Sequence, residues 1–126
     1  MERKNIIVGV LLVAVFLILG AYLESQLGAG VLWKTSSRHS FWKIAHIHGL
    51  GFGILNILYG LLLKNYGVKN NVFNAGSYLA VLGLFMPLGL FLAGIQSDLK
   101  MIVPVGGVSM IFAWLVFAWG YFVKKI

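Results

Sequence analysis

Residues 41–60, FWKIAHIHGLGFGILNILYG, hold the pattern that decides the fold of this chain. After Lys43 no Lys, Arg, Asp or Glu occurs until Lys64. An apolar stretch of this length crosses the roughly 30 Å hydrocarbon core of a bilayer as a helix. The same stretch carries two of the three histidines of the chain, His46 and His48, and four of its glycines. The sequence therefore predicts a membrane-spanning helix that begins with a pair of imidazoles.

The composition of the whole chain indicates lipid as its solvent. Of the 126 residues, 60% are hydrophobic and 10% are charged, whereas a soluble domain is about half apolar and about a quarter charged. The length fits one domain, 1–126. The absence of cysteine excludes disulfides, thiolate catalysis and cysteine-ligated metal centres. The net charge of +7 does not indicate nucleic-acid binding, because the basic residues are scattered at segment ends.

Three further stretches without Lys, Arg, Asp or Glu bring the expected number of spans to four. In hydrocarbon, every backbone polar group must be paired within its own segment, so each span is predicted to be helical. Short links between the spans favour neighbours that run in opposite directions. The predicted fold class is an all-α, polytopic membrane protein with four transmembrane helices in an antiparallel bundle. We place the helices near 5–24, 44–63, 73–95 and 101–123.

Two prolines fall within the predicted helices, and the first helix could be mistaken for a signal peptide. Pro87 lies inside the third predicted helix, where it removes a backbone hydrogen bond and usually produces a kink. Pro104 lies near the start of the fourth, where a missing N–H costs little. We interpret the first span as a retained helix rather than a signal peptide, because its apolar run is long and no A-x-A site follows.

The distribution of Lys and Arg predicts the orientation. The side that holds both termini and the second link carries six basic residues: Arg3, Lys4, Lys64, Lys69, Lys124 and Lys125. The opposite side carries four, namely Lys34, Arg38, Lys43 and Lys100, together with Glu24 and Asp98. Basic residues accumulate on the cytoplasmic side of a membrane. We therefore expect a multi-pass protein of the cell membrane with cytoplasmic termini and with all three histidines at the external end.

Small residues recur along the last three predicted spans at steps of three and four, or of their sum. The rows are His46, Gly49, Gly53, Asn56 and Gly60; Gly76, Ala80, Gly83, Pro87 and Gly94; and Gly106, Ser109, Ala113 and Gly120. Such spacing keeps one stripe toward a neighbouring helix, and small residues allow the close backbone approach that holds helices together in lipid. The rows predict compact packing, and they offer seams for other membrane subunits or for self-association. We expect Asn56 to bridge helices.

The histidines are candidate ligands. His46 and His48 are two residues apart, so they point about 200° away from each other on a helix. His46 falls on the row of small residues, whereas His48 falls on a bulky row with Phe52, Leu55 and Tyr59. Histidine commonly ligates haem b, copper and zinc. The candidate cofactor-binding residues are therefore His46 and His48, and the candidate metal ligands are His39, His46, His48, Glu24 and Asp98.

One short pattern has a counterpart in a known family. The run Ala45-His46-Ile47-His48-Gly49-Leu50-Gly51, leading to Leu58-Tyr59-Gly60-Leu61, resembles the His-x-His-plus-glycine opening of the second helix in small four-helix membrane proteins related to subunit I of haem-copper oxidases. The likeness covers about 20 residues. It implies a four-helix membrane fold, with His46 and His48 as haem or metal ligands.

Three functional hypotheses follow. The favoured one is an accessory or structural subunit of a larger membrane complex, because no complete catalytic set can be assembled from the sequence. The second is a membrane protein that binds haem b, copper or zinc through His46 and His48. The third is a small transporter, in which polar groups at one membrane face relay protons. A purely structural alternative is also open, with the imidazoles hydrogen-bonded to Glu24, Gln26, Asp98 or a backbone carbonyl.

Overall fold

The computed structural model describes residues 2–66 and 71–124, and every secondary-structure element in these ranges is helical. The elements, in chain order, are α1 (Glu2–Ser25), α2 (Val31–Lys34), α3 (Ser37–Tyr66), α4 (Asn71–Leu82), α5 (Phe85–Ala93), the 3-10 helix η1 (Ser97–Ile102) and α6 (Val103–Lys124). The predicted all-α class is therefore confirmed. Lys69 and Lys125, which contribute to the predicted charge asymmetry, lie outside the described residues.

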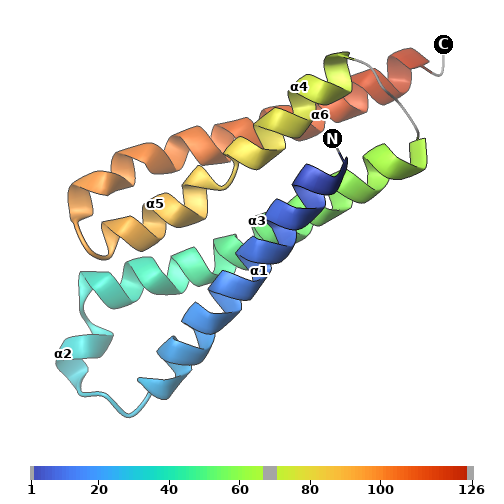
Figure 1. The fold of residues 1–126 in the computed structure, drawn as a ribbon. Coiled ribbons are helices and arrows are strands. Elements are labelled where there is room, and N and C mark those ends of the chain that lie inside the picture. Colours follow the sequence, from blue (N-terminus) through green and yellow to red (C-terminus); the bar gives the residue numbers. More distant parts are fainter. Residues whose placement is uncertain (1, 67–70, 125–126) are drawn as a thin grey trace.

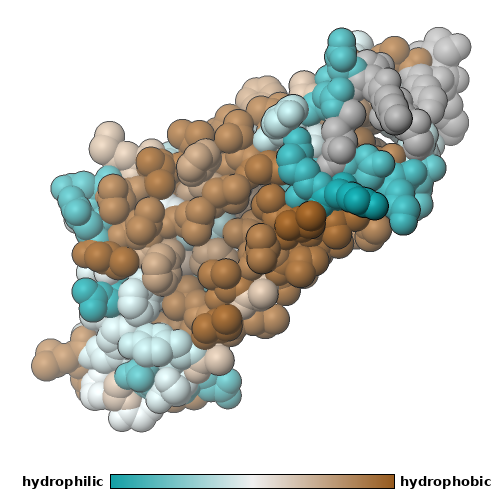
Figure 2. Space-filling model, in the orientation of Figure 1, coloured by the Kyte–Doolittle hydropathy of each residue, from teal (hydrophilic) through white to brown (hydrophobic). Residues whose placement is uncertain are grey.

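Four stretches are long and apolar enough to cross a membrane, as the sequence predicts. They are Glu2–Ser25, Ser37–Tyr66, Asn71–Ala93 and Ser97–Val123. Hydrophobic residues form a band across the middle of the face seen in Figure 2, and hydrophilic residues gather toward its ends. This distribution suits a molecule whose middle faces hydrocarbon and whose ends face water.

Each long helix passes its predecessor in the opposite direction (Figure 1). Along α1 and α3 the neighbouring positions are Glu2 with Gly60, Gly9 with Gly53, Phe16 with Gly49 and Gly20 with His46. Positions therefore rise along α1 as they fall along α3. The same order holds where α4 and α5 meet α6, with Phe73 beside Gly120, Gly83 beside Met110 and Gly89 beside Val103.

α3 begins earlier than the charge-free stretch predicts. The helix begins at Ser37 rather than near Ile44, because Ser36 caps it: its Oγ accepts the backbone N–H of His39 at 3.1 Å. A serine at this position satisfies one of the unpaired donors of the first turn. The first turns of α3 therefore carry charged and polar side chains. The charge-free gap marks the apolar part of this helix and not its full length.

The third candidate span is broken rather than smoothly kinked. α4 ends at Leu82 and α5 begins at Phe85 (Figure 1). Pro87 explains the position, since a proline ring clashes with the carbonyl four residues earlier and brings no N–H to it. That carbonyl belongs to Gly83, and it accepts the N–H of Met86 at 3.1 Å instead. The predicted disturbance at Pro87 is therefore confirmed, and it lies in the turn that precedes the proline.

Two clusters of buried side chains hold the helices together. One joins α3, α4 and α6 through Tyr59, Leu63, Phe73, Ala80, Met110, Ala113 and Phe117. The other joins α1, α3 and α5 through Leu12, Phe16, Leu19, Ala45 and Leu90. The rows of small residues run beside these clusters, and all of their members except the partly exposed His46 are buried inside the chain. The seams that the sequence offered for partners thus serve contacts between helices of one chain.

Replacing Gly53 by alanine is expected to lower the stability of the fold by about 1–3 kcal/mol, because overpacking forces backbones apart. A Cβ at Gly53 would lie 2.9 Å from the carbonyl oxygen of Gly9 and 2.7 Å from Val13 Cγ2. Gly51→Ala is the matched control, since nothing lies within 4 Å of its Cβ position. Circular dichroism during thermal unfolding in detergent measures both. Equal midpoints for the two variants would contradict the close contact.

Candidate functional site

His46 lies in the contact between α3 and α1. Its Nδ1 is 2.6 Å from the backbone carbonyl oxygen of Phe16. Because a carbonyl can accept but cannot donate a hydrogen bond, Nδ1 carries the proton and donates it. A Cβ at Gly20 would collide with the imidazole, so glycine at this position makes room for the ring. This hydrogen bond joins α3 to α1 and agrees with the structural alternative, while the predicted role of His46 as a ligand through Nε2 stays a prediction.

His48 points to a different neighbourhood. Its Nδ1 is 2.9 Å from the carbonyl oxygen of Ile44, one turn earlier on α3, and the same argument makes Nδ1 the donor. Nε2 is then the nitrogen that can accept a hydrogen bond or bind a metal. The ring lies nearly parallel to that of Phe52, with centroids 6.3 Å apart and an interplanar angle of 24°. His48 and Phe52 thus share a face, as the predicted bulky row requires.

A groove between α3 and α6, with Met86 of α5 beside it, receives the His48 ring. Its volume is about 600 Å³, and it is lined by His48, Phe52, Leu55, Met86, Gly107, Met110, Ile111, Trp114 and Leu115. Tyr59 belongs to the same predicted row but is fully buried in the core. The indole nitrogen of Trp114 is buried, with no hydrogen-bond partner among the described residues. We call this hollow the His48 groove.

The other predicted metal ligands do not join the two histidines. His39 Nδ1 is 3.2 Å from the carbonyl oxygen of Lys34, and its ring packs edge-on against Trp33 at 5.5 Å. Glu24 ends α1 and Asp98 lies in η1, and both are exposed. Within residues 2–66 and 71–124, no three His, Cys, Asp or Glu side chains gather in a group that could hold a metal ion.

A buried polar network joins α1, α3 and α4, and its α3 member, Asn56, lies about two turns beyond His48. Asn5 of α1 donates through Nδ2 to Asn56 Oδ1 of α3 and to the carbonyl oxygen of Ser77 of α4, each at 3.2 Å. Ser77 Oγ donates to Asn5 Oδ1, and Asn56 Nδ2 donates to the Ala80 carbonyl oxygen at 3.0 Å. All three polar side chains are fully buried. Asn56 bridges helices as predicted.

The sequence pattern alone does not predict Asn5 and Ser77 as the partners of Asn56. Asn5 follows three charged residues and resembles an ordinary helix start, while Ser77 is a small residue of a kind common in membrane helices. One signal was available, because Ser77 directly follows Gly76 on the predicted row of small residues. A polar residue beside such a row lies close to the neighbouring helix.

Comparison with known proteins gives no relative for this all-helical chain: no protein family, no curated protein and no solved structure matches it. The resemblance of the His46–His48 segment to proteins related to haem-copper oxidase subunit I therefore stays a prediction.

Asn56→Ala is expected to destabilise the fold by about 1–3 kcal/mol, because Asn5 Nδ2 then loses one of its two buried acceptors and the Ala80 carbonyl oxygen loses the Asn56 donor. Asn65→Ala is the matched control, since Asn65 is exposed near the end of the same helix. Chemical unfolding in detergent gives both values. A double-mutant cycle with Asn5→Ala isolates the pair, and strictly additive losses would show that the two amides do not interact.

Proposed function

We propose that this chain is an integral membrane protein of the cell membrane, with its four long helical segments in an antiparallel transmembrane bundle and both termini in the cytoplasm. The four candidate spans and the hydrophilic ends of the molecule support insertion (Figure 2). The order of contacts along α1, α3 and α6 supports the alternating directions. The excess of Lys and Arg on the side of the termini supports the orientation.

We further propose that it acts as an accessory or structural subunit of a larger membrane complex. The polar groups between its helices favour a structural role, because Asn5, Asn56, Ser77 and His46 are bonded to one another or to backbone carbonyls. They hold helices together rather than facing a substrate. The surface that remains for interaction is apolar and lies on the outside of the bundle.

The outer side of α6 offers the longest row for a partner helix. Its members are all more than half exposed and follow steps of three and four: Val105, Val108, Phe112, Leu115, Trp119 and Phe122. This is the spacing at which one helix presents a continuous stripe to another. Leu115 also lines the His48 groove, so the row and the groove form one continuous surface.

The position of His48 is the observation that carries the proposal. Its Nε2 can accept a hydrogen bond, and the groove around it is almost wholly apolar. Lipid chains carry no donor, whereas hydroxyl and amide side chains of a neighbouring transmembrane helix do. A partner helix seated in the His48 groove would therefore satisfy this nitrogen and cover the apolar wall at the same time.

Gly107→Leu is expected to release the partner, because the added side chain fills the His48 groove. The fold should tolerate it, since the first added carbon meets only Met86 Sδ at 3.4 Å. Gly51→Leu is the matched control at an exposed glycine with open space around it. Native electrophoresis after mild solubilisation of native membranes measures the assembly. Wild type and Gly51→Leu should migrate in one complex well above 13.9 kDa, and Gly107→Leu should not.

Two results would contradict the accessory role. One is a wild-type chain that migrates alone at every detergent concentration at which its helix content is retained. The other is a Gly107→Leu variant that keeps the wild-type complex at unchanged stoichiometry.

The His48 groove also favours a second candidate function, the binding of haem or a metal ion. The volume of about 600 Å³ lies within the usual range for ligand pockets. His48 Nε2 would supply the ligand, and the Phe52 ring beside it would form part of the apolar wall around the bound group. His46 cannot join it through Nδ1, because that nitrogen donates to the Phe16 carbonyl.

The absorption spectrum and metal content of the purified protein test this second function. A Soret band or bound metal that is lost in His48→Ala but kept in His39→Ala would support it, because His39 lies outside the groove. A colourless and metal-free wild-type protein would exclude it. A signal that survives His48→Ala would place any bound group elsewhere.

A further inference from the structure

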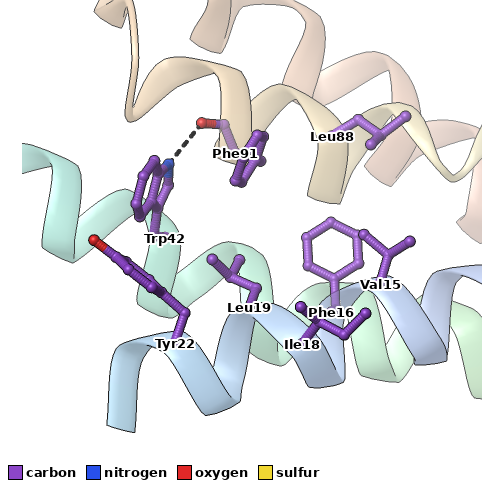
Figure 3. A pocket seen from close by; sticks show the side chains of 8 residues that line it. All are labelled: Val15, Phe16, Ile18, Leu19, Tyr22, Trp42, Leu88 and Phe91. Atoms are coloured by element: carbon purple, nitrogen blue, oxygen red, sulfur yellow. Dashed lines mark hydrogen bonds between the residues drawn. The ribbon is translucent and has the colours of Figure 1, made fainter. Parts of the chain in front are cut away.

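A second hollow lies between α1 and α5. Its volume is about 470 Å³, and it shares no lining residue with the His48 groove. Val15 and Phe16 of α1 and Leu88 of α5 line one end, while Tyr22 and Trp42 stand at the other (Figure 3). Every side chain in its wall is aliphatic or aromatic. We call this hollow the α1–α5 groove.

The shape of the α1–α5 groove follows from the packing around it. α1 packs mainly on α3, and α5 packs on α3 and α6. The groove therefore lies between α1 and α5, with α3 behind both. Phe16 closes the bottom of the groove, because it is 1% exposed and its ring fills the space beside Gly49. The outer lip is formed by Val15 and Ile18, which are 53% and 71% exposed. The groove therefore opens toward the surroundings of the bundle.

One end of the groove has the character of a membrane interface. The Trp42 ring stacks on Phe91 with centroids 5.3 Å apart and planes 10° apart, and its indole N–H donates to the Phe91 carbonyl oxygen at 2.9 Å (Figure 3). Tyr22 packs edge-on against Trp42 at 5.8 Å. Rings of this kind, with an apolar body and a polar tip, gather at the level of lipid headgroups.

Arg38 is held at the same end. Its Nε donates to the carbonyl oxygen of Gly94 at 3.1 Å, and its guanidinium carbon lies 5.6 Å from the centre of the Trp42 ring. Arginine carries five N–H donors, so the bond to Gly94 leaves the outer fork of the guanidinium for another acceptor. This planar fork matches a phosphate group, which it can bind through two parallel hydrogen bonds.

We propose that the α1–α5 groove is a binding site for one phospholipid, with an acyl chain between α1 and α5 and the phosphate on Arg38. The inference rests on the proposed insertion in a bilayer, but not on membership of a complex. Surrounding lipid is as apolar as the groove wall, so burial of the chain alone gives no preference for this position. Pairing of the fixed cationic Arg38 with the phosphate provides the preference.

Charge complementarity also favours a phospholipid over a partner helix at this groove. Arg38, Lys34 and Lys43 lie at the same end of the molecule, on α2 and the first turns of α3. An anionic headgroup suits such an environment. A hydrophobic helix would bring no anionic group to pair with Arg38. The two hollows thus differ in the partner they fit, since the His48 groove offers a hydrogen-bond acceptor and the α1–α5 groove has a cation at one end.

Native mass spectrometry of delipidated protein titrated with phosphatidylglycerol tests the site. Wild type should take up one lipid before any others. Val15→Trp fills the groove and should weaken this first binding about tenfold or more, whereas Val10→Trp should not. Val15 and Val10 are matched on α1, since they are 53% and 52% exposed and only Val15 lines the groove. Circular dichroism checks that both variants stay folded.

A second pair of variants tests the headgroup contact. Arg38→Gln should weaken the first binding about tenfold, the usual effect of losing a charge-assisted hydrogen bond. Lys64→Gln removes the same charge from the other end of the same helix and should leave it unchanged. Equal effects of the two substitutions would mean that Arg38 attracts the lipid only through its charge, and they would overturn the proposed phosphate site.

Other outcomes are equally decisive. Uptake of lipid without a preferred first molecule would overturn the inference, and so would a first binding that Val15→Trp leaves intact. Loss of a bound protein, rather than a lipid, from Val15→Trp would assign the groove to a partner helix. A folded wild type that assembles through the His48 groove but binds no preferred lipid would refute only this inference. A lipid-binding wild type that never assembles would refute only the accessory role.

Discussion

The close approach of α1 and α3 depends on residues without side chains, and the rest of the interior depends on that approach. A Cβ on Gly9 would lie 2.5 Å from the carbonyl oxygen of Gly53, and one on Gly53 would lie 2.9 Å from that of Gly9. At this separation the backbones leave no room for intervening side chains. The polar bonds between the two helices, from His46 to the Phe16 carbonyl and from Asn5 to Asn56, flank the glycine contact and need the same closeness.

The inside and the outside of the molecule therefore have different functions. Inside, small residues and paired polar groups fix the helices, since close packing and hydrogen bonds replace the hydrophobic effect wherever lipid is the solvent. Outside, each of the two apolar grooves has a polar side chain at or beside one end. His48 offers an acceptor in the groove beside α6, and Arg38 offers a cation beside the aromatic end of the groove between α1 and α5. The proposed partner helix and phospholipid follow from that difference.

Local sequence predicts those features that local physics controls. Charge-free stretches predict the four candidate spans, periodic small residues predict the buried rows, and Pro87 predicts the break between α4 and α5. The partners of Asn56 could not be predicted, because Asn5 and Ser77 come beside it only when three helices pack. The acceptor of His46 could not be predicted either, because it is a backbone carbonyl, and every residue has one. The sequence pattern places the five predicted metal ligands at one membrane face. Among the described residues no three of them gather at one point, because the distance between side chains also depends on the direction in which each one leaves its helix.

Labelling of single cysteines tests most directly whether these packed helices cross a bilayer four times. The chain has no cysteine of its own, so one introduced thiol reports one position. Ser25 and Ser97 are exposed where α1 ends and η1 begins, and Asn65 is exposed near the end of α3. In intact cells, a membrane-impermeant thiol reagent should label Ser25→Cys and Ser97→Cys but should reach Asn65→Cys only after permeabilisation. Labelling of all three from one side would contradict the four-span bundle.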